Sequence, residues 1–215
     1  RTSSSAASDV YKRQIDKLYG ERSSIKSEML QRKKKKETKA VAKLDTKQLA
    51  LKILMNTLYG ALSNEFFRYF DPRIAEGITI TGQYTIRSAE KAVNEYLNKA
   101  LQTKRVDYVI AIDTDSLYIN FGPFVKKFFP NKTKTQILNK LDKLATEVME
   151  PLLNNKYKQV QEKMGCKEQL MVMKREVIAD KGIWTGKKHY MLSVLDSEGV
   201  RYDEPDICLL YTSDA

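Results

Sequence analysis

Two carboxylates stand one residue apart in the middle of an apolar stretch of the chain. The sequence VIAIDTDSLYINF, residues 109–121, places apolar residues on both sides of Asp113 and Asp115, which predicts two strands joined by a turn. A plain hairpin explains one aspartate, because Asp is a common turn residue, but two neighbouring carboxylates repel each other. Mg²⁺ would remove that conflict, since it binds one or two protein carboxylates together with phosphate oxygens and water. The turn alone leaves both hypotheses open, a simple hairpin and a metal site for phosphoryl transfer.

A polar stripe along a predicted helix offers a second set of chemical groups. The sequence TKQLALKILMNTLYGALSN, residues 46–64, predicts one helix with Asp45 or Thr46 as its N-terminal cap. One face carries Lys52, Asn56, Tyr59 and Ser63. The opposite, apolar face comprises Leu51, Leu54, Leu58 and Ala61 or Leu62. Gly60 costs a helix about 1 kcal/mol relative to Ala, which suggests that another group packs closely there. The stripe is either an ordinary solvated face or a binding face for a phosphate, a sugar and a base.

A pair of cations precedes this helix. Arg22 and Lys26 are four residues apart in a segment from Ile15 to about Lys39, in which apolar residues recur at helical spacing. Residues four apart share a helix face, so two such helices facing each other would form a clamp for phosphate groups. The basic run RKKKKETK, residues 32–39, is interpreted as a solvated helix end or turn.

The composition is that of a folded, basic protein. The chain has 215 residues, is 42% hydrophobic and carries a formal net charge of +11, which favours a polyanionic partner such as nucleic acid. A Lys-rich solvated surface explains the same charge. No apolar run reaches the roughly 18 residues of a membrane helix. The two cysteines, Cys166 and Cys208, form no pattern of a disulfide scaffold or zinc site, and a reducing compartment such as the cytoplasm fits them.

The remaining pattern mixes helices with antiparallel strands, which predicts the α+β class. A helix over 86–101 follows the break at Asp71 and Pro72, and a longer helix over 134–165 bends at Pro151 and ends at Gly165. The inward faces predicted for them are Ile86, Ala89, Val93, Leu97 and Ala100, and Ile137, Leu141, Leu144, Val148 and Leu152. Before the carboxylate turn, Val106, Tyr108, Ile110 and Ile112 are predicted to share one strand face. We expect a strand over 168–179 and a hairpin over 187–202 that turns at DSEG.

Both ends of the chain resemble translated linker sequence. We assign no function to residues 1–14 or 208–215, and we expect the natural sequence to run from about Ile15 to Ile207 as a piece of a longer protein.

Four short motifs together resemble family B (alpha-type) DNA polymerases, especially the replicative polymerases of large tailed bacteriophages. They are LYGERSSIK from Leu18, KILMNTLYG from Lys52, AIDTDSLYI from Ala111 and WTGKKHY from Trp184, in the family's order and spacing. Three departures from the family pattern are Thr57 in place of Ser, Ala111 and Ile112 in place of Tyr-Gly, and His189 in place of Arg. A neutral histidine would weaken phosphate contact there.

The resemblance implies a fold and a role for each motif. Residues 15–66 would form two antiparallel fingers helices, and residues 67–207 would form part of the palm, an antiparallel sheet backed by helices. Within the palm, the metal-site hairpin would span about 106–121 and the primer-grip hairpin about 183–203. The triphosphate of the incoming nucleotide would contact Arg22, Lys26 and Lys52, and the nascent base pair would contact Asn56 and Tyr59. The metal site would comprise Asp115 as the principal ligand, Asp113 beside it and Glu176. The primer strand would contact Lys187, Lys188, Tyr190 and Ser116.

The resemblance also implies cofactors and partners. They would be two Mg²⁺ ions, for which Mn²⁺ can substitute, primer-template DNA, deoxynucleoside triphosphates and a sliding clamp bound through regions outside these residues. A viral source would place the protein in the host cytoplasm. The upstream DxxSLYP motif, which supplies the family's second metal-binding Asp, is not in the 215 residues, so we expect this chain by itself to be inactive. Two alternatives are a non-catalytic basic DNA-binding module, in which both aspartates are turn residues, and a protein-primed polymerase, which WTGKKHY and the motif spacing disfavour.

Overall fold

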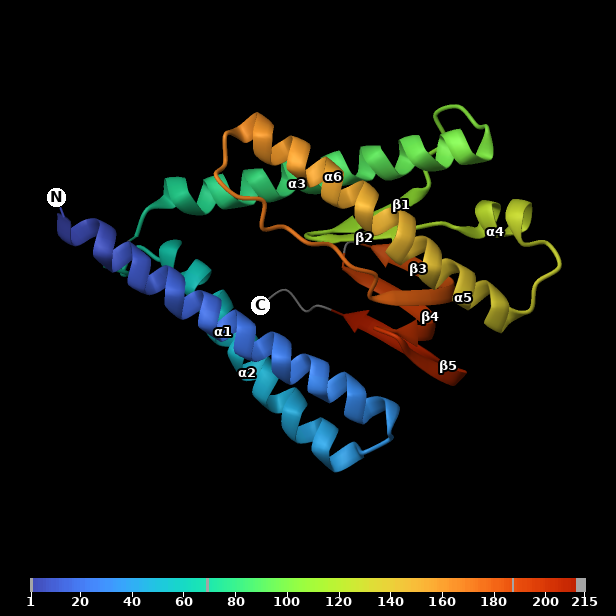
Figure 1. The fold of residues 1–215 in the computed structure, drawn as a ribbon, viewed down its shortest axis with the longest axis horizontal. Coiled ribbons are helices and arrows are strands. Elements are labelled where there is room, and N and C mark those ends of the chain that lie inside the picture. Colours follow the sequence, from blue (N-terminus) through green and yellow to red (C-terminus); the bar gives the residue numbers. More distant parts are fainter. Residues whose placement is uncertain (1, 69, 187, 212–215) are drawn as a thin grey trace. The chain divides into compact units, whose positions relative to one another are not determined.

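The computed structural model describes residues 2–211 apart from residues 69 and 187 (Figure 1). The chain divides into two compact units, Arg1–Ile78 and Thr79–Ala215, and each is described by itself. The predicted α+β class is confirmed, because helices combine with antiparallel sheets. No helix among the described residues is long and apolar enough to cross a membrane.

The first unit contains a hairpin of two antiparallel helices, α1 (Thr2–Lys34) and α2 (Thr38–Leu62) (Figure 1). The basic run ends α1 and forms the exposed turn at Lys35 and Lys36, as predicted. The prediction that α2 begins with a cap at Asp45 or Thr46 is wrong. Helix-forming residues from Thr38 onward extend the helix, and the Thr46 hydroxyl donates back to the Ala42 carbonyl oxygen at 3.0 Å.

The apolar face predicted for α2 does not form a core within this chain. Ile25 and Met29 of α1 are buried, whereas α2 buries none of its residues. Leu54 and Leu58 of that face keep 55% and 37% of their surface exposed. No described neighbour lies within 4 Å of the position that a Cβ at Gly60 would take, so the close packing predicted there is not provided by this chain.

A long helix, α3 (Pro72–Leu101), carries the predicted core face of the second unit. It begins at Pro72, where the Asp71 carboxylate accepts from the backbone N–H of Arg73 at 3.0 Å, so the break predicted at Asp71 and Pro72 is confirmed. The helix starts 14 residues before the predicted Ile86. Its predicted face includes the buried residues Ile86, Ala89, Val93 and Leu97, with Ala100 half-buried.

A two-stranded antiparallel sheet packs under α3. Strands β1 (Val109–Asp113) and β2 (Ser116–Ile119) form the predicted hairpin. The predicted alternation of buried and exposed side chains fails at Ile110, which is 55% exposed, whereas Val109 is buried. The cause is an irregularity in the strand register between Val109 and Ala111, which changes which side chains face the core. The core joins α3, the β1–β2 hairpin and later helices. Its buried residues are Ala89, Val93, Leu97, Tyr108, Val109, Phe124, Leu153 and Tyr157.

The next helices are α4 (Gly122–Phe128), α5 (Lys134–Leu144), the π-helical turn η1 (Ala145–Met149) and α6 (Glu150–Met164). The bend predicted at Pro151 takes the form of η1, because proline has no N–H to continue the α-helical hydrogen bonding. Gly165 ends α6 in the left-handed conformation with φ of 66°, as predicted. The predicted inward face is wrong by one position. The most buried side chains are Leu138, Met149, Leu153, Tyr157 and Val160, whereas the predicted residues are half-buried.

The second sheet has three antiparallel strands in the order β3 (Val177–Gly186), β4 (His189–Ser197) and β5 (Val200–Tyr211). The turn predicted at DSEG is confirmed, with Glu198 and Gly199 at positive φ, as a two-residue hairpin turn requires. The strand predicted from residue 168 begins only at Val177. Before it, side chains rather than strand pairing hold the segment, since Met173 packs against the core and Arg175 forms ion pairs.

Candidate functional site

The carboxylate pair lies at the tip of the β1–β2 hairpin. Asp113 is the last residue of β1 and is half-buried, whereas Asp115 lies in the turn and is exposed. Asp113 pairs with Ser116 across the hairpin, and between them Thr114 has a φ of 53°, which is unusual for a β-branched residue. The Thr114 hydroxyl donates to Asp113 Oδ1 at 3.1 Å. The tight turn therefore places both aspartates at the tip of the hairpin.

An aromatic cluster connects this hairpin to the second sheet. It consists of Tyr118 on β2, Trp184 on β3 and Tyr190 on β4. The Tyr118 hydroxyl donates to the Tyr190 hydroxyl, and their ring centroids are 5.1 Å apart. Trp184 stacks on Tyr190 at 6.2 Å and meets the edge of Tyr118 at 5.6 Å. Side chains up to 72 residues apart in sequence thus meet near the carboxylate turn, since Tyr118 is two residues from Ser116.

The surroundings of Tyr118 raise the pKa of its hydroxyl above the usual value. Burial raises the pKa of the Tyr118 hydroxyl most, the hydrogen bond with Tyr190 adds to the rise, and the charges of Asp113 and Glu176 contribute further. Asp113 and Glu176 therefore both act on one phenol, which places the negative charge of each near it. Sequence reasoning missed Tyr118 and Trp184 as site residues, although each lies inside a motif beside the residues that it did select.

An ion-pair network fixes the backbone at Glu176. The neighbouring Arg175 pairs with Asp142 at 2.6 Å and with the fully buried Asp196. The backbone N–H of Glu198 donates to the Glu176 carbonyl oxygen at 2.6 Å. The Glu176 side chain itself is exposed. The hydrogen bond from Glu198 and the ion pairs of Arg175 thus hold the backbone of Glu176 in place while its side chain is exposed to solvent.

The predicted primer-grip residues lie at the hairpin between β3 and β4. Gly186 pairs with His189, and Lys187 and Lys188 are the two residues between them in sequence. Lys188 is exposed with a φ of 61°, and Lys187 lies outside the described residues. Tyr190 belongs to the aromatic cluster, so this loop directly adjoins the group that contacts the carboxylate hairpin.

The predicted nucleotide-binding residues lie on the α1–α2 hairpin of the first unit. An ion pair between Lys47 of α2 and Glu21 of α1, 3.5 Å apart, shows which residues of the two antiparallel helices lie opposite each other. This register places Arg22 near residue 46, and Lys52 is six residues, about 9 Å, further along α2. Arg22 and Lys26 are half-buried, and Lys52, Asn56 and Tyr59 are exposed. The buried Arg22 Nε has no hydrogen-bond partner among the described residues. The hairpin thus carries a row of cations followed by an amide and an aromatic ring.

Comparison with known proteins identifies the family. The family described as DNA polymerase family B matches residues 3–179 of the chain. The chain belongs to this family. It is 40% identical over 215 aligned residues to the DNA-directed DNA polymerase of Escherichia phage RB69, which covers 94% of this chain and 23% of that protein. The DNA-directed DNA polymerase of Enterobacteria phage T4 is 38% identical over 182 residues, covering 80% of this chain and 20% of that protein. The expected resemblance to phage family B polymerases is confirmed.

A more distant relative is the DNA polymerase beta of African swine fever virus, isolate Tick/Malawi/Lil 20-1/1983. It is 35% identical over 114 residues, covering 53% of this chain and 7% of that protein. The chain spans less than a quarter of the length of the phage relatives. The family match includes both the α1–α2 hairpin and the carboxylate turn, and it ends at Ala179, before the predicted primer-grip loop.

The carboxylate turn of this family B chain suits a hard divalent cation. Mg²⁺ keeps several waters and binds proteins through only one or two carboxylates, leaving positions for phosphate oxygens. Asp113 and Asp115 are two carboxylates in one turn, a number that fits this preference. Among the residues that the structure describes, no three His, Cys, Asp or Glu side chains form a metal cluster, so Glu176 does not complete a three-ligand group with the two aspartates.

Proposed function

We propose that this chain supplies the nucleotide-binding helices and the carboxylate turn of a template-directed DNA polymerase. The observation that carries the proposal is the pair Asp113 and Asp115 at a hairpin tip, within a region that belongs to DNA polymerase family B. The phage relatives, which are named DNA-directed DNA polymerases, support the same reaction. The substrates would be primer-template DNA and deoxynucleoside triphosphates, and the reaction would occur in the host cytoplasm. A sliding clamp would bind through parts of the longer protein.

The proposed reaction joins the primer 3′-oxygen to the α-phosphorus of the nucleotide and releases pyrophosphate. Asp115, with Asp113 beside it, would hold the cations, and Glu176 would add negative charge nearby. Two Mg²⁺ ions, or Mn²⁺ in their place, would activate the primer hydroxyl and neutralise the phosphates when bound. The Tyr118–Tyr190 contact would keep the carboxylate turn in register with the loop that grips the primer.

The cations of the α1–α2 hairpin would act on the leaving group. Arg22, Lys26 and Lys52 would bind the triphosphate, and their positive charge would stabilise the negative charge that develops on pyrophosphate. Asn56 and Tyr59 would lie against the nascent base pair, about one and two turns beyond Lys52 along α2. The helices would approach the carboxylate turn before the chemical step, as a closing element does in many enzymes.

The primer strand would be held by the loop between β3 and β4. Lys187 and Lys188 would contact its phosphates, and Tyr190 and Ser116 would lie near its end. The DxxSLYP motif is not among the 215 residues, so we expect this chain by itself not to extend a primer with either Mg²⁺ or Mn²⁺.

The experiment that tests the proposal replaces the matching segment of the phage RB69 polymerase with residues 15–207 of this chain. In that chimera, Asp115→Ala should reduce primer extension by about a thousandfold, equivalent to roughly 4 kcal/mol of transition-state stabilisation. DNA binding should remain. The exposed Asp203→Ala provides a matched control and should keep full activity. If the Asp115→Ala chimera extends primers normally, both aspartates are turn residues and the chain is a non-catalytic DNA-binding module.

A further inference from the structure

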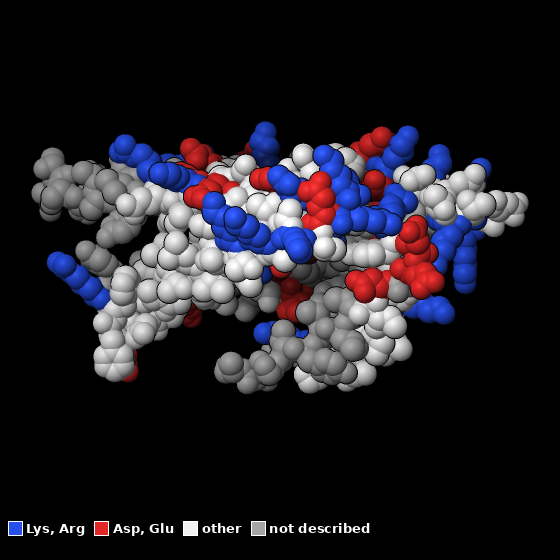
Figure 2. Space-filling view, turned by 90° about the horizontal axis from the view of Figure 1, so that it is seen from below, with Lys and Arg blue, Asp and Glu red and all other residues white. Residues whose placement is uncertain are grey.

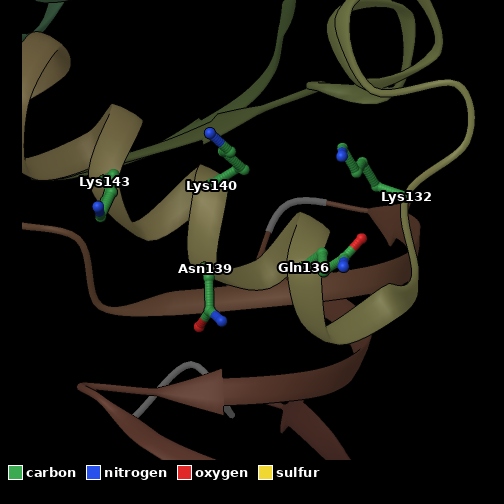
Figure 3. A pocket seen from close by; sticks show the side chains of 5 residues that line it. All are labelled: Lys132, Gln136, Asn139, Lys140 and Lys143. Atoms are coloured by element: carbon green, nitrogen blue, oxygen red, sulfur yellow. The ribbon is translucent and has the colours of Figure 1, made fainter.

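A shallow hollow on the surface of the second unit is lined by one helix and the loop before it. Its volume is about 270 Å³, and its lining residues are Lys132, Gln136, Asn139, Lys140 and Lys143 (Figure 3). Four of them lie on α5 at spacings of one to four residues, which keeps them along one side of the helix. Lys132 reaches the hollow from the loop that precedes the helix (Figure 3). None of the residues that carry the proposed polymerase reaction lines it.

The two amide side chains in the hollow turn their oxygens toward hydrogen-bond donors of the protein. Gln136 Oε1 accepts from the backbone N–H of Thr133 at 3.2 Å, and Asn139 Oδ1 accepts from Arg201 Nη2 at 3.1 Å. A backbone N–H and a guanidinium have no acceptor, so each must face the oxygen of the amide and not its nitrogen. The NH₂ groups of Gln136 and Asn139 are the ends that remain available. With three ammonium groups beside them, the polar groups of this hollow are mostly hydrogen-bond donors.

The positive charge of the hollow is not balanced by an ion pair among the residues that the structure describes. Lys132, Lys140 and Lys143 form no ion pair with any described residue, whereas the adjacent Lys134 pairs with Asp180 at 2.9 Å. No carboxylate belongs to the lining. The face of the molecule in Figure 2 shows Asp and Glu side chains among the Lys and Arg side chains. A cluster of cations without a counter-charge is destabilised by repulsion, and an anion in the hollow would relieve it.

We propose that this hollow binds a phosphate group carried by a nucleic-acid strand. A phosphate diester accepts hydrogen bonds through its free oxygens and donates none, which matches a lining of three ammonium groups and two amide NH₂ groups. The volume lies below the roughly 300–1,000 Å³ of pockets for drug-sized ligands, so a single phosphate fits better than a whole nucleotide. The phosphate chemistry follows from the lining alone, whereas the choice of nucleic acid as its carrier rests on the proposed function. The hollow would then hold the strand at a position separate in sequence from the primer-grip loop.

The test compares two triple variants of the 215-residue chain that remove the same charge. One is Lys132→Gln with Lys140→Gln and Lys143→Gln, and the control is Lys91→Gln with Lys126→Gln and Lys158→Gln, all exposed positions. Binding of a labelled 20-nucleotide single strand is measured by fluorescence anisotropy between 50 and 200 mM NaCl. The hollow variant should bind about tenfold more weakly than the control, because charge-assisted bonds to one phosphate are lost. Its slope of log affinity against log salt should be about 0.7 shallower, the value for one phosphate of a single strand.

A second variant tests the hollow without removing a lysine. Gln136→Glu preserves the capping box at the start of α5, in which Glu serves as well as Gln, but it places a carboxylate in the lining. It should weaken strand binding as the triple variant does, while the circular dichroism spectrum stays unchanged.

Inorganic phosphate, matched against chloride at equal ionic strength, identifies the source of the ligand. Weaker strand binding in both hollow variants but not in the control supports the nucleic-acid strand. Phosphate-induced shifts of the amide NMR signals of residues 132–143, with equal strand affinities for all variants, would support the phosphate site but assign it to a free phosphate. Equal strand affinities without such shifts would overturn the proposal. No polymerase assay is involved, so this result is independent of the result from the Asp115→Ala chimera.

Discussion

Asp196→Asn is the substitution whose effect the structure predicts most directly. Asp196 has 0% of its surface exposed. One oxygen accepts from Arg175 and, at 3.0 Å, from the backbone N–H of Gly199. The other lies 2.6 Å from Arg201 Nε, as an ion pair outside hydrogen-bond geometry. The amide keeps the shape of the side chain but removes its charge and replaces one acceptor oxygen by an NH₂ donor, so both ion pairs of Asp196 are lost.

The expected loss of stability depends on the interactions that Arg175 and Arg201 keep after the substitution. Breaking a buried ion pair typically costs about 3–5 kcal/mol. Arg175 retains Asp142 at 2.6 Å, and the Arg201 side chain is 35% exposed and can be solvated, so the low end of about 3 kcal/mol applies. At roughly 2–4 °C per kcal/mol for a chain of this size, Tm should fall by about 6–12 °C.

Thermal unfolding followed by tryptophan fluorescence checks this prediction. The chain has one tryptophan, Trp184, which lies on β3 of the sheet that contains Asp196, so the signal reports on this unit. The control is Asp180→Asn, which makes the same chemical change at a pair with Lys134 whose side chains are 58% and 30% exposed. An exposed pair is worth at most about 1 kcal/mol, so Tm should fall by no more than about 4 °C. A fall for Asp196→Asn no larger than for the control would refute the reasoning that this buried charge stabilises the sheet.

Three further predictions concern pH, the turn and the nucleotide. Burial is the main cause that raises the pKa of Tyr118 above 10.0, so the neutral phenol contributes its full stability below about pH 10, and this contribution is lost as pH rises through the folded-state pKa. Urea unfolding between pH 8.5 and 11 should therefore show a weaker pH dependence of stability in Tyr118→Phe than in the unchanged chain. Identical pH dependences would contradict this prediction. Gly199→Ala should destabilise the chain by about 1 kcal/mol, because Gly199 has a φ of 80°. The control Gly82→Ala, inside α3, should be neutral or stabilising. Equal effects of the two substitutions on Tm would contradict the claim that the DSEG turn needs glycine at position 199. In the polymerase chimera, Lys52→Ala should raise the nucleotide KM and lower kcat, reducing kcat/KM by roughly tenfold in steady-state kinetics, whereas Lys39→Ala should change neither.

Local patterns were sufficient wherever a short stretch decides its own conformation. The hairpin at Asp113 to Ser116 was predicted because β-branched runs flank a turn, and the DSEG turn because Gly199 tolerates positive φ. The end of α6 at Gly165 followed from the same property. These features depend on residues adjacent in sequence, so no distant contact was needed to establish them.

Predictions failed where a boundary or a face depends on what the segment packs against. α2 starts at Thr38 rather than Thr46 because helix-forming residues outweigh a local cap, and its apolar face at Leu54 remains exposed in this chain. The buried face of α5 and α6 includes Leu138 and Leu153, one position from the prediction, because apolar residues occur on two adjacent faces and only the neighbouring helix and sheet select one.

The sequence by itself determined the family of this protein, the two aspartates and the cations spaced along one helix face, because motif order and helical spacing are linear properties. Only the tertiary structure decided that Tyr118, Trp184 and Tyr190 meet, since hydrogen bonds and ring contacts between strands far apart in sequence leave no periodic signal. It alone also decided that Asn139 of the hollow on α5 turns its oxygen to Arg201. The orientation of an amide depends on the partner that folding brings to it, and that partner is 62 residues away.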